Sequence, residues 1–266
     1  MRAVVVVCLV CPLVAQDTSD LGHGRWRLRT ALAAGTFDFV QGRSPFLPSP
    51  MPAGTSTLDS RISALLLRLQ GEFVGGDHIG GGVRFESMAS PNSQFTGAFA
   101  FDVRDARDHS AFAHLTWCVD TDRFTMPIRV GALANRLEVE YSRAGNPRED
   151  DFTSFGPYFE LAPEWSLVGA HGSRWSIYAE GGIGWTTTRI GGTPGSFPFD
   201  SKTRFVGVEV GTRLDIGTWE AGTCEVGLAY VARFQRMERS DPEAGVTISP
   251  FDANFQGVLV SFAVRF

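Results

Sequence analysis

The chain has 266 residues, of which 43% are hydrophobic and 20% are charged, and its formal net charge is -5. Only Lys202 among the 24 basic residues is a lysine, and acids outnumber bases, so the composition excludes the basic surface that a nucleic-acid partner requires. The length suits one large all-β domain, since barrels often use more than about 200 residues for a single unit. A mean hydropathy of -0.02 is compatible with a membrane barrel, because every strand of such a barrel carries a polar face.

The first 16 residues have the pattern of a cleaved secretory signal peptide. Arg2 precedes an apolar run that ends at Val14, and Ala15 supplies the small residue of a cleavage site. The run is shorter than the roughly 20 residues of a spanning helix. A buried N-terminal strand is the alternative. We therefore expect residues 1–16 to be removed and residues 17–266 to form a single domain.

From Arg25 onward, alternating segments are separated by clusters of Gly, Pro, Asn, Asp or Ser. This pattern is typical of an all-β, antiparallel, up-and-down transmembrane β-barrel. In the clearest segment, Trp175 and Trp185 share one face, and a strand tilted by about 45° would separate them by roughly 23 Å, close to the height of an apolar band. The segments predicted as strands are Arg25–Val40, Leu58–Phe73, Ile79–Phe85, Phe95–Val103, Leu115–Val119, Phe124–Ala132, Leu137–Tyr141, Phe155–Leu161, Trp175–Thr186, Val206–Leu214, Val226–Tyr230 and Val258–Phe266.

This alternation predicts about 12 strands. Ten strands are the alternative, because Ala64–Leu69 is apolar on both faces and Ala162–Gly172 is long for a turn. The expected periplasmic turns are Val103–His109, Ala134–Asn135 and Ile216–Gly222. The expected extracellular loops are Gln41–Thr57, Ser142–Asp151, Arg189–Lys202 and Arg236–Asn254.

The last strand ends in Phe266, with Val264, Phe262 and Val260 at alternate positions. This ending resembles the C-terminal signal by which the barrel-insertion machinery recognises outer-membrane proteins. An ordinary edge strand that ends in phenylalanine is the alternative.

Charged residues recur on the polar faces of the predicted strands, with the two signs nearly balanced. Opposite charges on neighbouring strands of a narrow barrel pair with one another, so we expect a lumen partly filled by ion pairs. The alternative is a narrow path for a small solute. The candidate lumen-lining residues are Arg129, Glu138, Glu140, Glu180, Glu209 and Arg213.

The sequence offers no convincing catalytic or metal site. His171 and Ser173 have a His-x-Ser spacing, but they fall in a predicted turn, and Glu180 is too far along the strand to orient the histidine. The other histidines are not grouped with the three or four ligands that a metal site requires. We expect no cofactor. Cys118 and Cys224 are predicted to face opposite sides of the wall, which excludes a disulfide between them.

Short motifs in the C-terminal third resemble a known family. Tyr178–Trp185 (YAEGGIGW), Gly211–Arg213, Gly227–Tyr230 and Val264–Phe266 resemble the last strands of outer-membrane lipid A deacylase and acyloxyacyl hydrolase-like barrels. The resemblance implies the barrel architecture and, in the family, a His-x-Ser pair on the penultimate strand. This chain has Ala232 and Phe234 at those positions.

These patterns predict a non-enzymatic barrel of a Gram-negative outer membrane, with a structural or narrow, porin-like channel role and extracellular loops as interaction sites. The expected partners are outer-membrane lipid and the insertion machinery, with a small solute or a lipid as ligand. One alternative is a lipid acyl hydrolase, similar to the lipid A deacylases, with an unrecognised site. A secreted or periplasmic soluble barrel is the other alternative.

Overall fold

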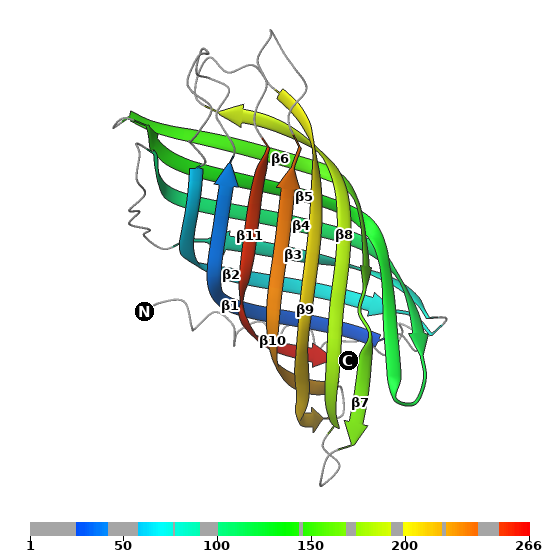
Figure 1. Ribbon diagram of the computed structural model, residues 1–266. Helices are drawn as coiled ribbons and strands as arrows, with labels where there is room; N and C mark the ends of the chain where they lie inside the picture. The colour runs from blue at the N-terminus through cyan, green and yellow to red at the C-terminus, as the bar shows by residue number, and fades with distance from the viewer. Residues whose placement is uncertain are drawn as a thin grey trace.

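The computed structural model describes residues 25–41, 58–76, 78–90, 101–143, 146–168, 174–192, 199–219, 222–238 and 250–266. These residues form a single antiparallel sheet (Figure 1). Its strands are β1 (Arg25–Gln41), β2 (Leu58–Val74), β3 (Ile79–Ala89), β4 (Phe101–Asp120), β5 (Phe124–Arg143), β6 (Asn146–Leu161), β7 (Glu164–Val168), β8 (Arg174–Gly192), β9 (Phe199–Trp219), β10 (Gly222–Met237) and β11 (Phe251–Arg265). Within these ranges, no helix is long and apolar enough to cross a membrane.

The sheet closes on itself. Its order runs β4-β3-β2-β1-β11-β10-β9-β8-β6-β5, and β5 pairs with β4 to complete the ring. The first and last strands, β1 and β11, pair along their whole length, from Arg27 opposite Arg265 to Gln41 opposite Phe251. The prediction of an all-β antiparallel barrel is therefore confirmed.

Strands β6 and β7 occupy one position in this ring. Leu161 of β6 lies opposite Ile128 of β5, and Trp165 of β7 lies opposite Phe124 in the same register. The interruption falls next to Pro163, which has no N–H to donate to the ladder. The barrel thus has ten strand positions, the lower of the two predicted numbers.

The prediction of 12 strands is too high by two, because the structure has continuous strands at two of the predicted turns. β4 runs without interruption through the predicted turn Val103–His109, and β5 runs through Ala134–Asn135. The predicted loop Ser142–Asp151 is also largely strand, since β5 ends at Arg143 and β6 begins at Asn146. β4 and β5 have 20 residues each, more than the roughly 9–11 residues that cross a membrane. The sequence pattern therefore predicts two strands where the structure has one.

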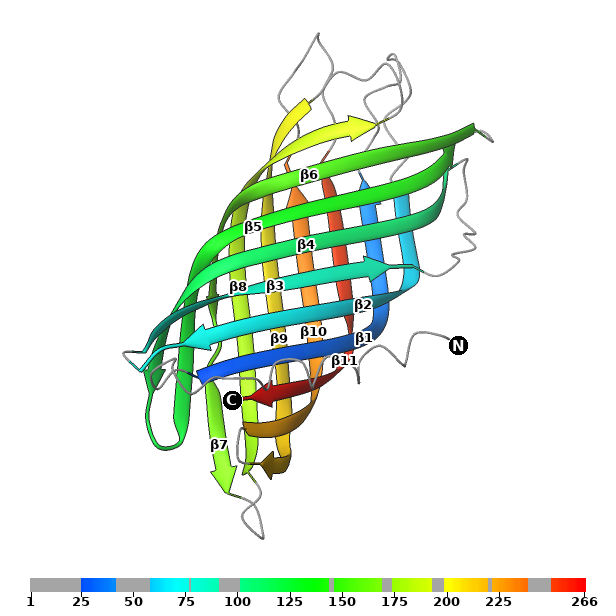
Figure 2. The ribbon, with the colours of Figure 1, turned by 180° about the vertical axis from the view of Figure 1, so that it is seen from behind.

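The two ends of the barrel differ in their connections (Figures 1 and 2). At the end where β1 begins and β11 finishes, called the lower end here, β2–β3, β4–β5 and β9–β10 are joined by two to four residues. At the upper end, β1–β2 and β10–β11 are joined by 16 and 13 residues. The predicted signal peptide and most of the long connections lie outside the described residues.

The outer wall carries an apolar belt. Leu115 of β4 is 73% exposed and Phe155 of β6 is 65% exposed, and both Trp175 and Trp185 of β8 face outward. Each of the ten barrel positions contributes at least one exposed large hydrophobic side chain to this belt. Above the belt, the outward side chains become charged, as at Arg107 and Arg136.

Candidate functional site: the barrel interior

The lower half of the interior is filled by charged side chains. Eight arginines and eight carboxylates form ion pairs there, and each of these side chains is at most 29% exposed. We call this set the arginine–glutamate layer. Its members are Arg27, Arg29, Arg68, Arg84, Arg129, Arg213, Arg233, Arg265, Glu72, Glu86, Glu160, Glu164, Glu180, Glu209, Glu225 and Asp215.

Glu209 on β9 connects distant strands of this layer. Its Oε1 lies 2.5 Å from Nη2 of Arg29 on β1 and accepts a hydrogen bond of 2.5 Å from the hydroxyl of Tyr178 on β8. Its Oε2 pairs with Arg68 on β2, four positions away around the ring. Arg29 also donates to Glu180, which accepts a second bond from Arg213 at 2.8 Å. The bonds from Arg29 and Arg68 cross the lumen, whereas those of Tyr178 and Arg213 join the neighbouring strands β8 and β9.

Arg129 on β5 connects strands β2 and β6 on the opposite side of the barrel. It is 3% exposed, and its Nε and Nη2 each lie 2.8 Å from an oxygen of Glu72, a bidentate arrangement. Its Nη1 donates to Glu160 at 2.6 Å, and Glu160 also accepts from Arg84 at 2.7 Å. Thr116 completes the shell of Glu72 with a bond of 2.7 Å. Burial of these charges is tolerable because each has partners on both sides.

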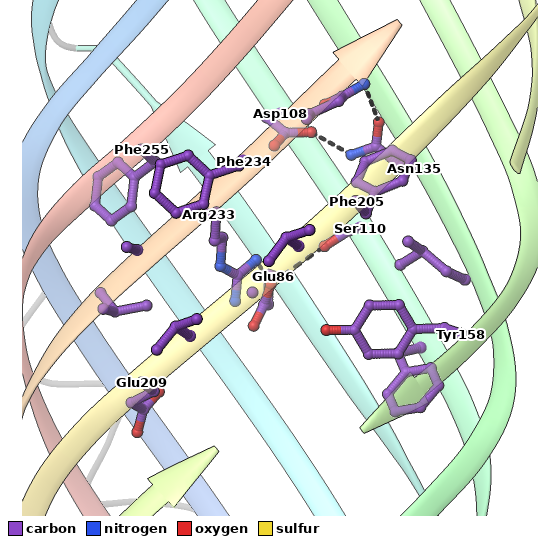
Figure 3. A pocket seen from close by; sticks show the side chains of 18 of the residues that line it. Glu86, Asp108, Ser110, Asn135, Tyr158, Phe205, Glu209, Arg233, Phe234 and Phe255 are labelled. Carbon is purple, nitrogen blue, oxygen red and sulfur yellow. Dashed lines mark hydrogen bonds and ion pairs between the residues drawn. The ribbon is translucent and has the colours of Figure 1, made fainter. Parts of the chain in front are cut away.

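A chamber lined by both polar and apolar side chains lies above this layer (Figure 3). Arg233 of β10 reaches Glu86 of β3 across the lumen, and higher up Gln235 donates to Asn135 on β5 at 3.4 Å. Asn135 in turn donates to Asp108. The space in the chamber open to a water centre is about 70 Å³. Above the Arg233–Glu86 pair of the layer, a polar bond thus crosses the lumen at one further level.

The upper interior is mainly apolar, with the buried hydroxyls of Ser154, Thr188 and Thr203 bonded to one another along one side. Phe152 of β6 and Phe251 of β11 lie four positions apart around the ring, yet their ring centroids are 4.6 Å apart. Phe39 packs on the other side of Phe251, with centroids 5.3 Å apart. We call this set the apolar plug, and its members are Phe37, Phe39, Ile62, Leu66, Met88, Leu137, Val139, Phe152, Ile190, Met237, Phe251 and Phe255. Their exposed fractions are all 4% or less, so the plug fills the upper lumen.

Four of the six candidate lumen residues lie in the interior. Arg129, Glu180, Glu209 and Arg213 are buried there and form ion pairs, whereas a role in a solute path stays a prediction. The other two candidates, Glu138 and Glu140, do not lie in the interior.

Glu138 and Glu140 lie on the outer face of β5, because their neighbours Leu137 and Val139 point into the plug. The predicted inward orientation of these two residues is wrong. It depended on a turn at Ala134–Asn135 that would shift the alternation by one residue, whereas β5 is continuous there. Glu138 pairs instead with Arg136 on the outer wall, at 2.9 Å.

Sequence reasoning missed two central members of the layer, Arg68 and Glu72. Both lie on β2, where Arg68, Gln70 and Glu72 alternate with Leu67 and Leu69. That alternation was a sufficient signal for the inward face. The apolar run that precedes it concealed the signal, because Ala64 and Leu66 face the plug while Leu65 faces outward.

The interior holds no obvious catalytic chemistry. Among the described residues, no three His, Cys, Asp or Glu side chains are grouped to hold a metal ion. His171 and Ser173 lie outside the described residues. Ala232 is buried and Phe234 faces outward, and neither supplies a proton-transfer group or a nucleophile. No disulfide is formed by Cys118 or Cys224 in the part of the chain that is described.

Comparisons with known proteins identify a fold rather than a family. No family model and no curated protein matches the sequence. The outer-membrane protease OmpT from Escherichia coli is similar in structure, with a TM-score of 0.51, 11% identity, and coverage of 93% of this chain and 98% of that one. This likeness shows that the chain has the closed-barrel fold of an outer-membrane protein.

Two further structures match with lower scores. The deltaS2 mutant of the monoaromatic hydrocarbon channel TodX has a TM-score of 0.34 and 10% identity, over 92% of this chain and 91% of that one. OprG from Pseudomonas aeruginosa has a TM-score of 0.30 and 10% identity, over 92% and 98%. The resemblance to the lipid A deacylases stays a prediction.

Proposed function

We propose that this chain is a sealed, non-enzymatic β-barrel of a bacterial outer membrane, which holds its upper connections at the cell surface for interactions. The observation that carries the proposal is the filled interior: a charged layer below, polar bonds across the chamber, and an apolar plug above. Each level joins strands that lie on opposite sides of the ring.

The outer wall supports the membrane location. Side chains such as Leu115, Phe155 and Val260 are more than half exposed, and equivalents are found around the entire ring. Soluble monomers rarely expose contiguous apolar patches larger than about 300–600 Å². A belt that encircles the barrel is instead the arrangement that lipid covers, with charged side chains beginning above it.

The interior supports a structural role over a channel. An open pore requires a continuous polar path, often with an excess of one charge at its constriction. Here the charges of the arginine–glutamate layer are equal in number, and the rings of Phe152 and Phe251 meet above it. A solute would have to displace both the plug and several ion pairs.

Two experiments test the two parts of the proposal. For the location, the full-length protein is expressed and fractionated, and its gel mobility is compared with and without boiling. We expect it in the outer membrane, with a mobility that changes on boiling. Recovery as a soluble monomer without detergent would refute the location.

For the sealing, the refolded protein is reconstituted in planar bilayers, after heat-modifiable mobility has verified folding. We expect no conductance steps above the bilayer background. Reproducible steps from the unaltered protein would show that the lumen opens, and the narrow-channel role would replace the structural one.

A further inference from the structure

We propose that the arginine–glutamate layer contains a binding site for one ordered water molecule, held at Gln70 between the two halves of the layer. A small internal cavity marks the site. Its lining residues are Arg27, Arg29, Gln70, Glu72, Arg129, Glu180 and Arg213.

Several polar atoms of this lining have no hydrogen-bond partner among the described residues. The Nε atoms of Arg27, Arg29 and Arg213 are buried without an acceptor among the described residues. Oε1 of Gln70 and Oε2 of Glu180 are buried without a donor. Apart from Arg27, these residues are at most 8% exposed. Buried polar groups in folded proteins nearly always have a hydrogen-bond partner, so five such atoms on one cavity indicate a bound molecule.

The mixture of donors and acceptors identifies that molecule as water. It accepts bonds from two of the three arginine Nε–H groups and donates its own hydrogens to Gln70 and Glu180. A halide ion accepts only, and would leave both oxygens unsatisfied. A metal ion would be repelled by the surrounding guanidinium groups. The lining holds four arginines and two glutamates, which disfavours a cation, and the two oxygens that need a donor favour water over an anion.

The size of the cavity agrees with a single molecule. The space open to a water centre is about 10 Å³, close to the roughly 10–15 Å³ that one buried water requires. A larger solute does not fit.

The site lies where a single arginine connects the two halves of the layer. Glu72 and Arg129 belong to one half, and Arg29, Glu180 and Arg213 form the other. Among the described ion pairs, Arg68 joins the halves, through Glu86 on one side and Glu209 on the other. Gln70 follows Arg68 at the next inward position of β2 and faces both halves. A water bound there adds a second connection.

A crystal structure of the refolded full-length protein, grown in sodium bromide at a resolution that shows ordered waters, tests the site. We expect a peak without anomalous signal, within about 3.2 Å of Gln70 Oε1 and of at least one arginine Nε. A bromide anomalous peak at this position would overturn the proposal. So would a cavity without any peak, or a Gln70 amide bonded directly to the arginines.

The matched variants are Gln70→Met and Gln235→Met. Both remove a buried amide from the interior, but Gln235 has a protein partner in Asn135 and lies in the chamber above. We expect the peak to be lost in Gln70→Met and kept in Gln235→Met. An unchanged peak in Gln70→Met would refute the assignment to Gln70. If Gln70→Met does not fold, the bromide data on the unaltered protein still decide between water, halide and an empty cavity.

Discussion

Substitution of Arg129 by alanine should be among the most destabilising single changes in the protein. The change removes three charge-assisted hydrogen bonds and leaves Glu72 without a paired arginine, whereas Glu160 keeps Arg84. Breaking a buried ion pair by removing one partner costs about 3–5 kcal/mol, because an uncompensated charge stays buried. We therefore expect Arg129→Ala to lower the free energy of unfolding by about 3–5 kcal/mol.

The matched control is Arg136→Ala on the same strand. Arg136 also contacts two carboxylates, but its side chain is 54% exposed on the outer wall. Exposed pairs contribute about 0–1 kcal/mol, so this variant should be nearly neutral. Urea titration of the refolded proteins in detergent, followed by tryptophan fluorescence, gives both free energies. Equal decreases in the free energy of unfolding for the two variants would refute the reasoning, because they would show that interior and outer ion pairs contribute equally to stability.

A double substitution separates the charge effect from the loss of packing. Arg129→Met together with Glu72→Met removes the bidentate pair and replaces it by unbranched apolar side chains. Replacing a buried ion pair as a whole is often neutral or stabilising. We therefore expect the double variant to be more stable than Arg129→Ala. A double variant that is less stable would show that the hydrogen bonds, rather than the stranded charge, dominate.

Three further variants probe the other levels of the interior. Gly182→Ala places a methyl group onto the buried ring of Tyr158 and should lower the free energy of unfolding by about 1–3 kcal/mol. The control Gly181→Ala has free space, so its free energy of unfolding should change by no more than about 0.5 kcal/mol in the same urea titration. Phe251→Ala removes the ring shared by both aromatic contacts of the plug and should cost about 3–5 kcal/mol; a loss under about 1 kcal/mol would show that the plug is not packed. Cys118 faces inward and is 8% exposed, so in a variant whose other cysteines are serine a polar maleimide should label it only after unfolding; rapid labelling of the folded protein would reveal a hydrated path.

The alternation along a strand predicts its faces well wherever the surroundings stay constant. On β8 and β9 the outward residues, such as Trp175, Ile177 and Val208, were assigned correctly, because the belt faces apolar surroundings along most of these strands. On the terminal strand β11 the predicted outward face holds at Val258 and Val260, but above Gly257 the apolar residues Phe255 and Phe251 point inward.

On β5 the same reasoning failed, because the apolar side chains face outward in the lower part of the strand and inward in its upper part. Val130 is apolar and outward, next to the inward Arg129, but higher up Leu137 is inward and Glu138 is outward. The apolar residues therefore shift by one position without any turn. From the sequence alone, such a shift has the same appearance as a short turn between two strands. Only pairing with β4 and β6 distinguishes the two, and pairing is a long-range property.

The pairing of β1 with β11 also constrains the order of folding. Arg29 arrives early in synthesis, but its partner Glu209 lies 180 residues later, and the strand that closes the ring is the last one made. Until β11 is in place, the inward charges of β1 face water or an incomplete sheet. Contacts between residues so distant in sequence make folding slow. For the arginines of β1, charge neutralisation is consequently linked to ring closure, and an assembly intermediate that lacks β11 would present these arginines along an open edge.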